Sequence, residues 1–198
     1  MKYLVIFLSS FILAGCATSG FNDVSSGNGA YATPANNITK PFVANANITA
    51  LNAQLQRDYA GSQVQVLKVG NEIKVTYPSD FLFGVGGEAL LPSSQASLDP
   101  LISAVKLYPL ATVRIDCFTD KSGSPEQNVA HSEERAQSVA RYLISGGLAA
   151  GKMSLKGYGS DFAVAKNDTV EGRAKNRRLV LTIKVPALVP TPVPQQQS

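Results

Sequence analysis

The 198-residue chain has little of the material from which most active sites are built: one histidine, two cysteines and no tryptophan. A hydrolase needs a zinc ligand set, two facing carboxylates or an activated nucleophile. The single histidine, His131, cannot supply a ligand set. The neighbouring acids Glu133 and Glu134 point in different directions on a predicted helix, which is typical of a solvated face. We therefore expect no enzyme activity, no metal site and no cofactor.

The chain also lacks a strong excess of charge of either sign. It carries 18 basic and 14 acidic side chains, which gives a net charge of +4. Proteins that bind nucleic acid usually have clustered Lys and Arg together with a motif that reads a groove. Neither feature is evident in this sequence, so we do not expect a nucleic-acid partner.

A hydrophobic run long enough to span a membrane is missing as well. The apolar run at 3–14 is shorter than the roughly 20 residues that a span needs. It follows Lys2 and ends in small residues, which is typical of a secretory signal peptide over residues 1–15. The sequence Leu13-Ala14-Gly15-Cys16 resembles a bacterial lipobox, which implies acylation of Cys16 with fatty acids such as palmitate. Ala17 after it favours the outer membrane, whereas the alternative is an ordinary signal peptide with a chance cysteine.

Cys117 is the only other cysteine. If Cys16 is acylated, the chain has no second thiol with which Cys117 can form an internal disulfide. Cys117 lies in the apolar run 113–118, so we expect a buried side chain that acts as a small hydrophobic residue.

Composition and hydrophobic periodicity divide the rest of the chain. Residues 16–47 are rich in Ser, Gly, Ala and Asn and are interpreted as a lipidated N-terminus with a flexible tether. Residues 48–77 contain a short amphipathic helix and a hairpin around Gly70-Asn71, and they lead into a domain at 78–186. The Pro- and Gln-rich tail at 187–198 is typical of disorder.

Helical and strand-like periods alternate along the domain. We expect helices at 97–108, 125–145 and 169–176, with Pro100 in the first turn of the first of these. Strands are expected at 111–118, 153–158 and 178–185. This alternation predicts an α/β fold with the architecture of a two-layer sandwich.

The stretch TDKSGSPEQNVAHSEERA, residues 119–136, places an acid and an arginine at opposite ends. Asp120 ends a strand, and Arg135 borders the apolar stripe of the following helix. Helical side chains lean towards the N-terminus, so the guanidinium of Arg135 points back to the turn that holds Asp120. The two charges are expected on opposite sides of one small cleft. The alternative is an Asp120–Arg135 salt bridge that closes the turn.

Three motifs carry a family resemblance. Thr119-Asp120-x-x-Gly123, then Asn128-x-x-His131-Ser132-x-x-Arg135-Ala136, then Gly172-Arg173-Ala174-Lys175-Asn176-Arg177-Arg178 resemble the signature of OmpA-like C-terminal domains, which also occur in Pal and MotB. The resemblance implies the OmpA-like fold, a two-layer α/β sandwich with a mixed sheet and helices packed on one face. It also implies non-covalent binding of peptidoglycan through the diaminopimelate of its stem peptide.

The same resemblance implies a role for individual residues. Asp120 matches the aspartate that accepts from the diaminopimelate ammonium, Arg135 the arginine that binds its carboxylate, and Asn128 the polar residue between them. Thr119 and Arg173 are further candidates; Arg177 and Arg178 either join the cleft or help to close the sheet. His131 replaces the family's leucine, and Asp116-Cys117-Phe118 replaces its usual glycine and histidine, which leaves the ligand preference open.

The resulting hypothesis is an outer-membrane lipoprotein whose domain faces the periplasm and tethers the membrane to the cell wall. The alternative is a wall-anchored accessory of a trans-envelope machine, such as a type IV (Dot/Icm-like) or type VI secretion system. Its partners would then include other envelope proteins as well as the stem peptide and the membrane.

Overall fold

The computed structural model of the chain describes residues 44–186. The predicted signal peptide, Cys16, most of the tether and the tail lie outside these residues. The described helices and strands follow one another as α1 (Ala44–Asp58), β1 (Gln65–Val69), β2 (Glu72–Pro78), α2 (Ser79–Phe83), α3 (Pro92–Lys106), β3 (Thr112–Phe118), α4 (Pro125–Ser145), a 3-10 turn (Ala150–Lys152), β4 (Met153–Gly157), α5 (Val170–Asn176) and β5 (Arg178–Lys184).

The strands form one mixed sheet in the order β1-β2-β5-β3-β4. β1 and β2 form the expected hairpin, and Gly70 in its turn has a φ of 57°, which favours glycine. β5 is antiparallel to both of its neighbours, β2 and β3, whereas β3 and β4 run parallel. The last strand of the domain is therefore the central one, and the residues just before it lie beside the end of β3.

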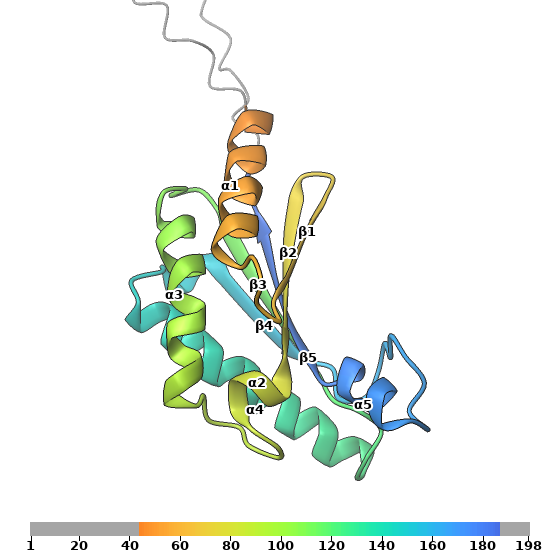
Figure 1. Ribbon diagram of the computed structural model, residues 1–198. Coiled ribbons are helices and arrows are strands. Elements are labelled where there is room, and N and C mark those ends of the chain that lie inside the picture. Colours follow the sequence, from red (N-terminus) through yellow and green to blue (C-terminus); the bar gives the residue numbers. More distant parts are fainter. Residues whose placement is uncertain (1–43, 187–198) are drawn as a thin grey trace, which may run out of the picture. The chain divides into compact units, whose positions relative to one another are not determined.

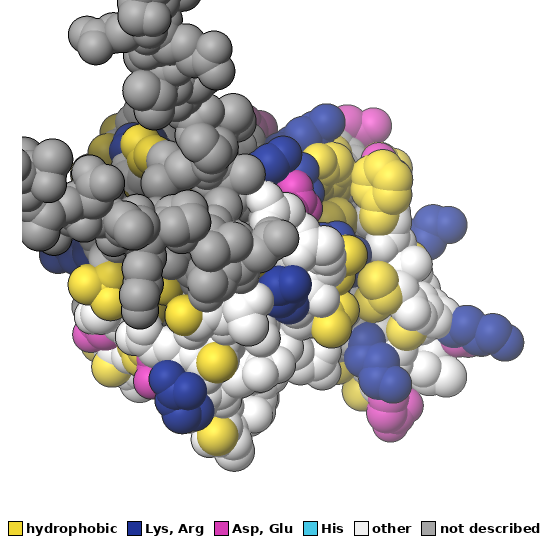
Figure 2. All heavy atoms as spheres, turned by 90° about the horizontal axis from the view of Figure 1, so that it is seen from above, with side chains coloured by type: hydrophobic (Ala, Val, Ile, Leu, Met, Phe, Trp, Pro, Cys, Tyr) yellow, Lys and Arg dark blue, Asp and Glu magenta, His cyan; other side chains and the backbone are white. Residues whose placement is uncertain are grey.

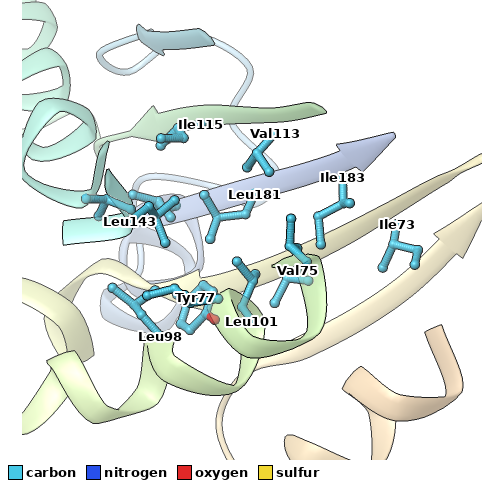
Figure 3. Packing of buried hydrophobic residues seen from close by; sticks show 14 of the residues in the cluster. Ile73, Val75, Tyr77, Leu98, Leu101, Val113, Ile115, Leu143, Leu181 and Ile183 are labelled. Atoms are coloured by element: carbon cyan, nitrogen blue, oxygen red, sulfur yellow. The ribbon is translucent and has the colours of Figure 1, made fainter. Parts of the chain in front are cut away.

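Three helices, α1, α3 and α4, cover one face of the sheet (Figure 1). The strand residues that point towards these helices are apolar and buried, because alternate side chains of a strand face opposite sides. Figure 3 shows strand residues packed against residues of α3 and α4. The labelled strand residues are Ile73, Val75, Tyr77, Val113, Ile115, Leu181 and Ile183, and the labelled helix residues are Leu98, Leu101 and Leu143. The predicted two-layer α/β sandwich with helices on one face is confirmed.

The helix before the hairpin belongs to this same core. Ile48, Leu51 and Leu55 of α1 are no more than 1% exposed. Just after α1, the hydroxyl of Tyr59 lies 2.6 Å from that of Tyr77 on β2, and it donates to the backbone oxygen of Ser97 on α3 at 2.9 Å. This buried tyrosine pair ties α1 to the sheet and to α3.

Two helices start earlier than predicted. α1 begins at Ala44, so residues 44–47 of the predicted flexible tether are helical. α3 begins at Pro92 and not at 97, so Pro100 lies inside the helix and not in its first turn. The polar segment 93–97 gives no apolar period, yet the Ser94 hydroxyl donates to the backbone oxygens of Leu82 and Leu91, both at 2.7 Å. Tertiary contact with the end of α2 thus extends the helix by five residues.

Helix α4 has the predicted bounds, and its start explains why. Pro125 occupies the first helical position, and the Ser124 side chain accepts from the backbone N–H of Gln127, whose side chain accepts in return from the Ser124 N–H. This capping box satisfies two of the backbone donors that a helix leaves open at its start. The turn before the helix is therefore fixed in place.

Cys117 is buried as expected, and burial raises the pKa of its thiol to about 11. Within residues 44–186, no helix has the length and apolar character needed to cross a membrane.

Candidate functional site

The motif residues gather at one end of the sheet, where β3 leads into α4. The short helices α2 and α5 lie at the same end (Figure 1). β3 ends at Phe118 and α4 starts at Pro125, so 119–124 forms the connecting loop. The order of the strands brings α5, directly before central strand β5, next to this loop. Parts of the chain that are more than 90 residues apart therefore build one site.

Asp120 is 7% exposed and uses both of its carboxylate oxygens. Oδ1 accepts from the backbone N–H of Ser122 at 2.8 Å, and Oδ2 accepts from Nη1 of Arg177 at 2.6 Å. Burial by itself would raise the pKa of Asp120. The hydrogen bonds from Arg177 and Ser122 outweigh burial and hold the pKa below its usual value. Asp120 is therefore ionised at neutral pH.

Arg177 joins Asp120 to a second acid, Asp80. Its Nε and Nη2 contact the Asp80 carboxylate at 2.9 and 2.6 Å, while Nη1 holds Asp120. The hydrogen bond to Asp80, followed by that to Asp120, raises the pKa of Arg177 above its ordinary value. The sequence identified Arg177 as a candidate but missed Asp80. The only local signal for Asp80 is an acid in the first turn of a short helix.

Arg135 contacts the last residue of α2, Phe83, and the loop that follows this helix. Its Nε donates to the backbone oxygen of Gly87 at 2.7 Å, and its guanidinium carbon sits 5.5 Å from the centre of the Phe83 ring. The residue is 5% exposed and so more deeply buried than its predicted position at the border of the apolar stripe. No ion pair within the described part of the chain includes Arg135.

Asp120 and Arg135 therefore do not pair with each other. The alternative of a salt bridge that closes the turn is wrong, because the partner of Asp120 is Arg177. Both charges adjoin α2: Arg177 links Asp120 to Asp80, and the Phe83 ring lies under the guanidinium of Arg135. Asp80 and Phe83 are about one helical turn apart on α2. Asp120, through Arg177, and Arg135 therefore both lie near this short helix, although they do not pair with each other.

The remaining candidates occupy the same end of the sheet in different ways. Asn128 lies in the first turns of α4 and is 6% exposed. The Thr119 hydroxyl donates to the backbone oxygen of Asp120 at 2.8 Å. Arg173 donates through Nη1 to the backbone oxygen of Asn167 at 3.0 Å, so it braces the loop before α5. Arg178 turns away, to lie 3.9 Å from the centre of the Phe118 ring.

His131 contacts the carboxylate of Glu88. Glu134, one turn further along α4, lies against the same carboxylate. The pKa of Glu88 is lowered, first by Glu134 and then by His131, and Glu88 in turn raises the pKa of Glu134. Glu88 follows Gly87, whose backbone oxygen accepts from Arg135. The contacts of Glu88 therefore hold this loop against α4. Within residues 44–186, no group of three His, Cys, Asp or Glu residues is arranged to hold a metal ion.

The part of the chain that contains this site is similar to known proteins. The OmpA family profile matches residues 82–177. The probable lipoprotein YiaD of Escherichia coli K12 is 32% identical over 131 residues, which is 66% of this chain and 60% of YiaD. The peptidoglycan-binding protein ArfA of Mycobacterium tuberculosis H37Rv is 39% identical over 101 residues, 51% of this chain and 31% of ArfA. The chain thus spans less than two thirds of either relative.

A solved structure supports the same relationship. The cell wall anchor of the T6SS from Pseudomonas aeruginosa superimposes with a TM-score of 0.63 at 26% identity, covering 69% of this chain and 97% of the anchor. Residues 82–177, which the family profile matches, contain the first two motifs and the third as far as Arg177. They also include α2 from Leu82 onward, but not Asp80. Residues 82–177 therefore belong to the OmpA family, and the chain carries an OmpA-like domain.

Proposed function

We propose that this chain is an envelope lipoprotein that binds peptidoglycan non-covalently through diaminopimelate and tethers the outer membrane to the cell wall. The observation that carries the proposal is the separation of two buried charges, Asp120 and Arg135, at one end of the sheet. Diaminopimelate offers an ammonium and a carboxylate on one carbon. A site that keeps an acid and an arginine apart is suited to such a zwitterion.

Arg135 is the proposed partner of the ligand carboxylate. Gly87 holds its Nε, and that is the one hydrogen bond of this side chain within residues 44–186. The two terminal nitrogens remain for a carboxylate, which a guanidinium binds through parallel hydrogen bonds. Phe83 and Gly87 fix the plane of the guanidinium beforehand, so less conformational freedom is lost when the ligand binds.

Asp120 is the proposed acceptor for the ligand ammonium. An ionised carboxylate has about four acceptor positions, and Ser122 and Arg177 occupy two of them. Asn128 lies between acid and arginine along the chain and is the proposed polar contact between them. Thr119 and Arg173 contribute indirectly, through the backbone oxygens of Asp120 and Asn167.

The relatives support the binding role and the location. ArfA is named a peptidoglycan-binding protein, and YiaD is named a probable lipoprotein. We extend both properties to this chain, with Cys16 as the acylated residue. The domain itself is not an enzyme, since OmpA-like peptidoglycan-binding domains are structural.

The binding site is tested by sedimenting the full chain with isolated peptidoglycan sacculi. Asp120→Asn and Arg135→Gln preserve side-chain size, which matters because both residues are buried. Charge-assisted hydrogen bonds contribute about 1.5–3 kcal/mol, so each change should weaken binding roughly ten- to a hundredfold. The double variant should be little worse than either single one, since a zwitterion released at one end has lost its orientation.

Arg141→Gln is the matched control, because Arg141 is an exposed arginine on the same helix. It should bind sacculi as the wild type does, and circular-dichroism melts should show all variants folded. Unchanged sacculus binding by a folded Arg135→Gln protein would refute the proposed site.

The lipid anchor is tested independently. Cys16→Ser should leave the protein without fatty acyl chains and release it from the membrane fraction. The measurement is mass spectrometry of the N-terminal peptide of the protein isolated from membranes. An unacylated N-terminus on the wild-type protein would contradict the anchor but not the wall-binding site.

A second candidate function is that of an accessory that fixes a trans-envelope machine, such as a type IV or type VI secretion system, to the wall. The likeness to the T6SS cell wall anchor, at 26% identity, favours it. Crosslinking in cells followed by affinity purification separates the two functions. A stoichiometric set of secretion proteins supports the accessory role, whereas wall fragments alone support the tether.

A further inference from the structure

The face of the sheet that the helices leave uncovered contains a trough. Its volume is about 360 Å³, and it lies over β2, β5 and β3 beside the loop that follows β4. Its lining includes the charged residues Lys74, Arg114, Asp116 and Arg178 and the aromatic residues Phe118, Tyr158 and Phe162. Figure 2 shows that exposed Lys and Arg side chains lie among hydrophobic ones on the surface of the molecule.

One wall of the trough is a column of rings and cations. Phe118 and Tyr158 stack with their ring centres 5.0 Å apart and their planes 7° from parallel. Arg178 lies 3.9 Å from the centre of Phe118, and Lys156 lies 4.8 Å from that of Tyr158. Each ring thus has a ring on one side and a cation near it. Arg178 lines the trough, whereas Lys156 lies outside the lining, next to the Tyr158 ring.

Phe162 stands at the mouth of the trough. It is 69% exposed, meets the Tyr158 ring edge-on, and has a φ of 57°, which is rare for a bulky side chain. Arg178 donates to its backbone oxygen at 2.9 Å and holds the loop in this conformation. A strained backbone that displays an aromatic ring to solvent is often part of a binding site.

The floor of the trough holds two buried oxygens that need partners. Asp116 receives Nε of Arg114 on Oδ2 at 2.8 Å, but its Oδ1 has no partner within the described residues. The Thr182 hydroxyl, on the neighbouring strand β5, is also buried without a partner in that part of the chain. Buried polar atoms are nearly always hydrogen-bonded, so a molecule with N–H or O–H groups fits here.

The charge of the trough indicates the sign of that molecule. Lys74, Arg114 and Arg178 line it against a single acid, Asp116, and Asp116 already pairs with Arg114. No carboxylate within residues 44–186 pairs with Lys74, Lys156 or Arg178. The net positive charge requires an anionic ligand, whereas the floor requires hydrogen-bond donors.

We propose that this trough is a docking site for an acidic, extended peptide segment of a partner protein. Backbone N–H groups of such a segment satisfy Asp116 and Thr182, and its carboxylates reach the cations at the rim. An anionic bilayer is flat and fits a concave surface poorly. A neutral glycan would need open ring faces, and here Arg178 and Lys156 lie near the rings of Phe118 and Tyr158.

The test uses the full chain and a fluorescent peptide of alternating glutamate and serine, with binding followed by anisotropy at low salt. Lys74→Glu combined with Lys156→Glu should weaken binding by roughly tenfold or more, because two attractive contacts become repulsive. Thr182→Val removes the floor hydroxyl at nearly constant shape and should weaken binding about fivefold. The matched peptide of glutamine and serine should not bind.

The control reverses two exposed lysines on the helix-bearing side, Lys106→Glu with Lys152→Glu, and changes the net charge by the same amount. Loss of peptide binding in this control would overturn the proposal, because it would show that binding depends on the net charge of the protein and not on the trough. No binding by the wild type, or unchanged binding by Thr182→Val, would also overturn it. Preference for phosphatidylglycerol vesicles over the peptide, lost with Lys74→Glu and Lys156→Glu, would assign the trough to membrane instead.

This inference is independent of wall binding. The Lys74→Glu, Lys156→Glu protein should still bind sacculi, and Arg135→Gln should still bind the peptide. A variant that binds sacculi but not the peptide, or the peptide but not sacculi, shows which of the two proposed sites it has lost.

Discussion

The bridge from Asp80 through Arg177 to Asp120 makes a sharp prediction about stability. Arg177→Gln removes the guanidinium but keeps most of the side-chain volume. Asp120, whose side chain is 9% exposed, loses a charge-assisted hydrogen bond that contributes about 1.5–3 kcal/mol. The Asp80 side chain is 33% exposed, so its bidentate contact is screened by water and contributes about 1 kcal/mol or less.

The free energy of unfolding should therefore fall by about 2–4 kcal/mol. For a domain of this size, that corresponds to a drop in Tm of roughly 5–15 °C. Urea titrations of the full chain, followed by circular dichroism, measure the free energy directly. Arg141→Gln is again the control, and it should change stability by less than about 0.5 kcal/mol because Arg141 is on the surface.

The pH dependence gives the same prediction a second readout. The folded-state pKa of Asp120 lies below its ordinary value of 3.8, so its contribution to stability is fully present above that value. It is lost as pH falls through the folded-state pKa. The difference between wild type and Arg177→Gln should thus stay constant from neutral pH to about pH 4 and narrow below it. Equal stability of the Arg177→Gln and Arg141→Gln proteins, or a difference that does not respond to acid, would show that the bridge through Arg177 does not stabilise the fold.

Two further predictions concern the loops that frame the site. Gly87→Ala should weaken sacculus binding without preventing folding. A Cβ at Gly87 would lie 2.1 Å from the backbone oxygen of Phe83, so it would displace the loop that orients Arg135. Unchanged binding would show that this loop does not position the arginine. Asn176→Ala should lower the free energy of unfolding by about 2–3 kcal/mol in urea titrations. The fully buried Asn176 amide accepts from the backbone N–H groups of Val164 and Ala165 and donates to two oxygens. A decrease in the free energy of unfolding of less than about 0.5 kcal/mol would contradict that role.

Local patterns made most of the fold predictable. Alternation around Gly70-Asn71 indicated the hairpin, and Ser124 with Pro125 marked the start of α4 because capping depends only on neighbours in the chain. Asp120 and Arg135 were found through their motif spacing, and the family resemblance was confirmed. The start of α3 could not be found in this way, because Ser94 is held by a carbonyl of another helix and not by an apolar period.

Most of the secondary structure and the fold class follow from the sequence alone, because periodicity, turn residues and caps act over a few neighbouring positions. How the charged residues pair depends on contacts between distant parts of the chain. Asp80 and Arg177 are 97 positions apart and Arg135 and Gly87 are 48 apart, and nothing in the local pattern links them. The contact between Asp80 and Arg177 arises because β5 inserts at the centre of the sheet, which brings the end of α5 beside the end of β3. The same insertion pairs Asp120 with Arg177, and Arg135 makes no ion pair within residues 44–186.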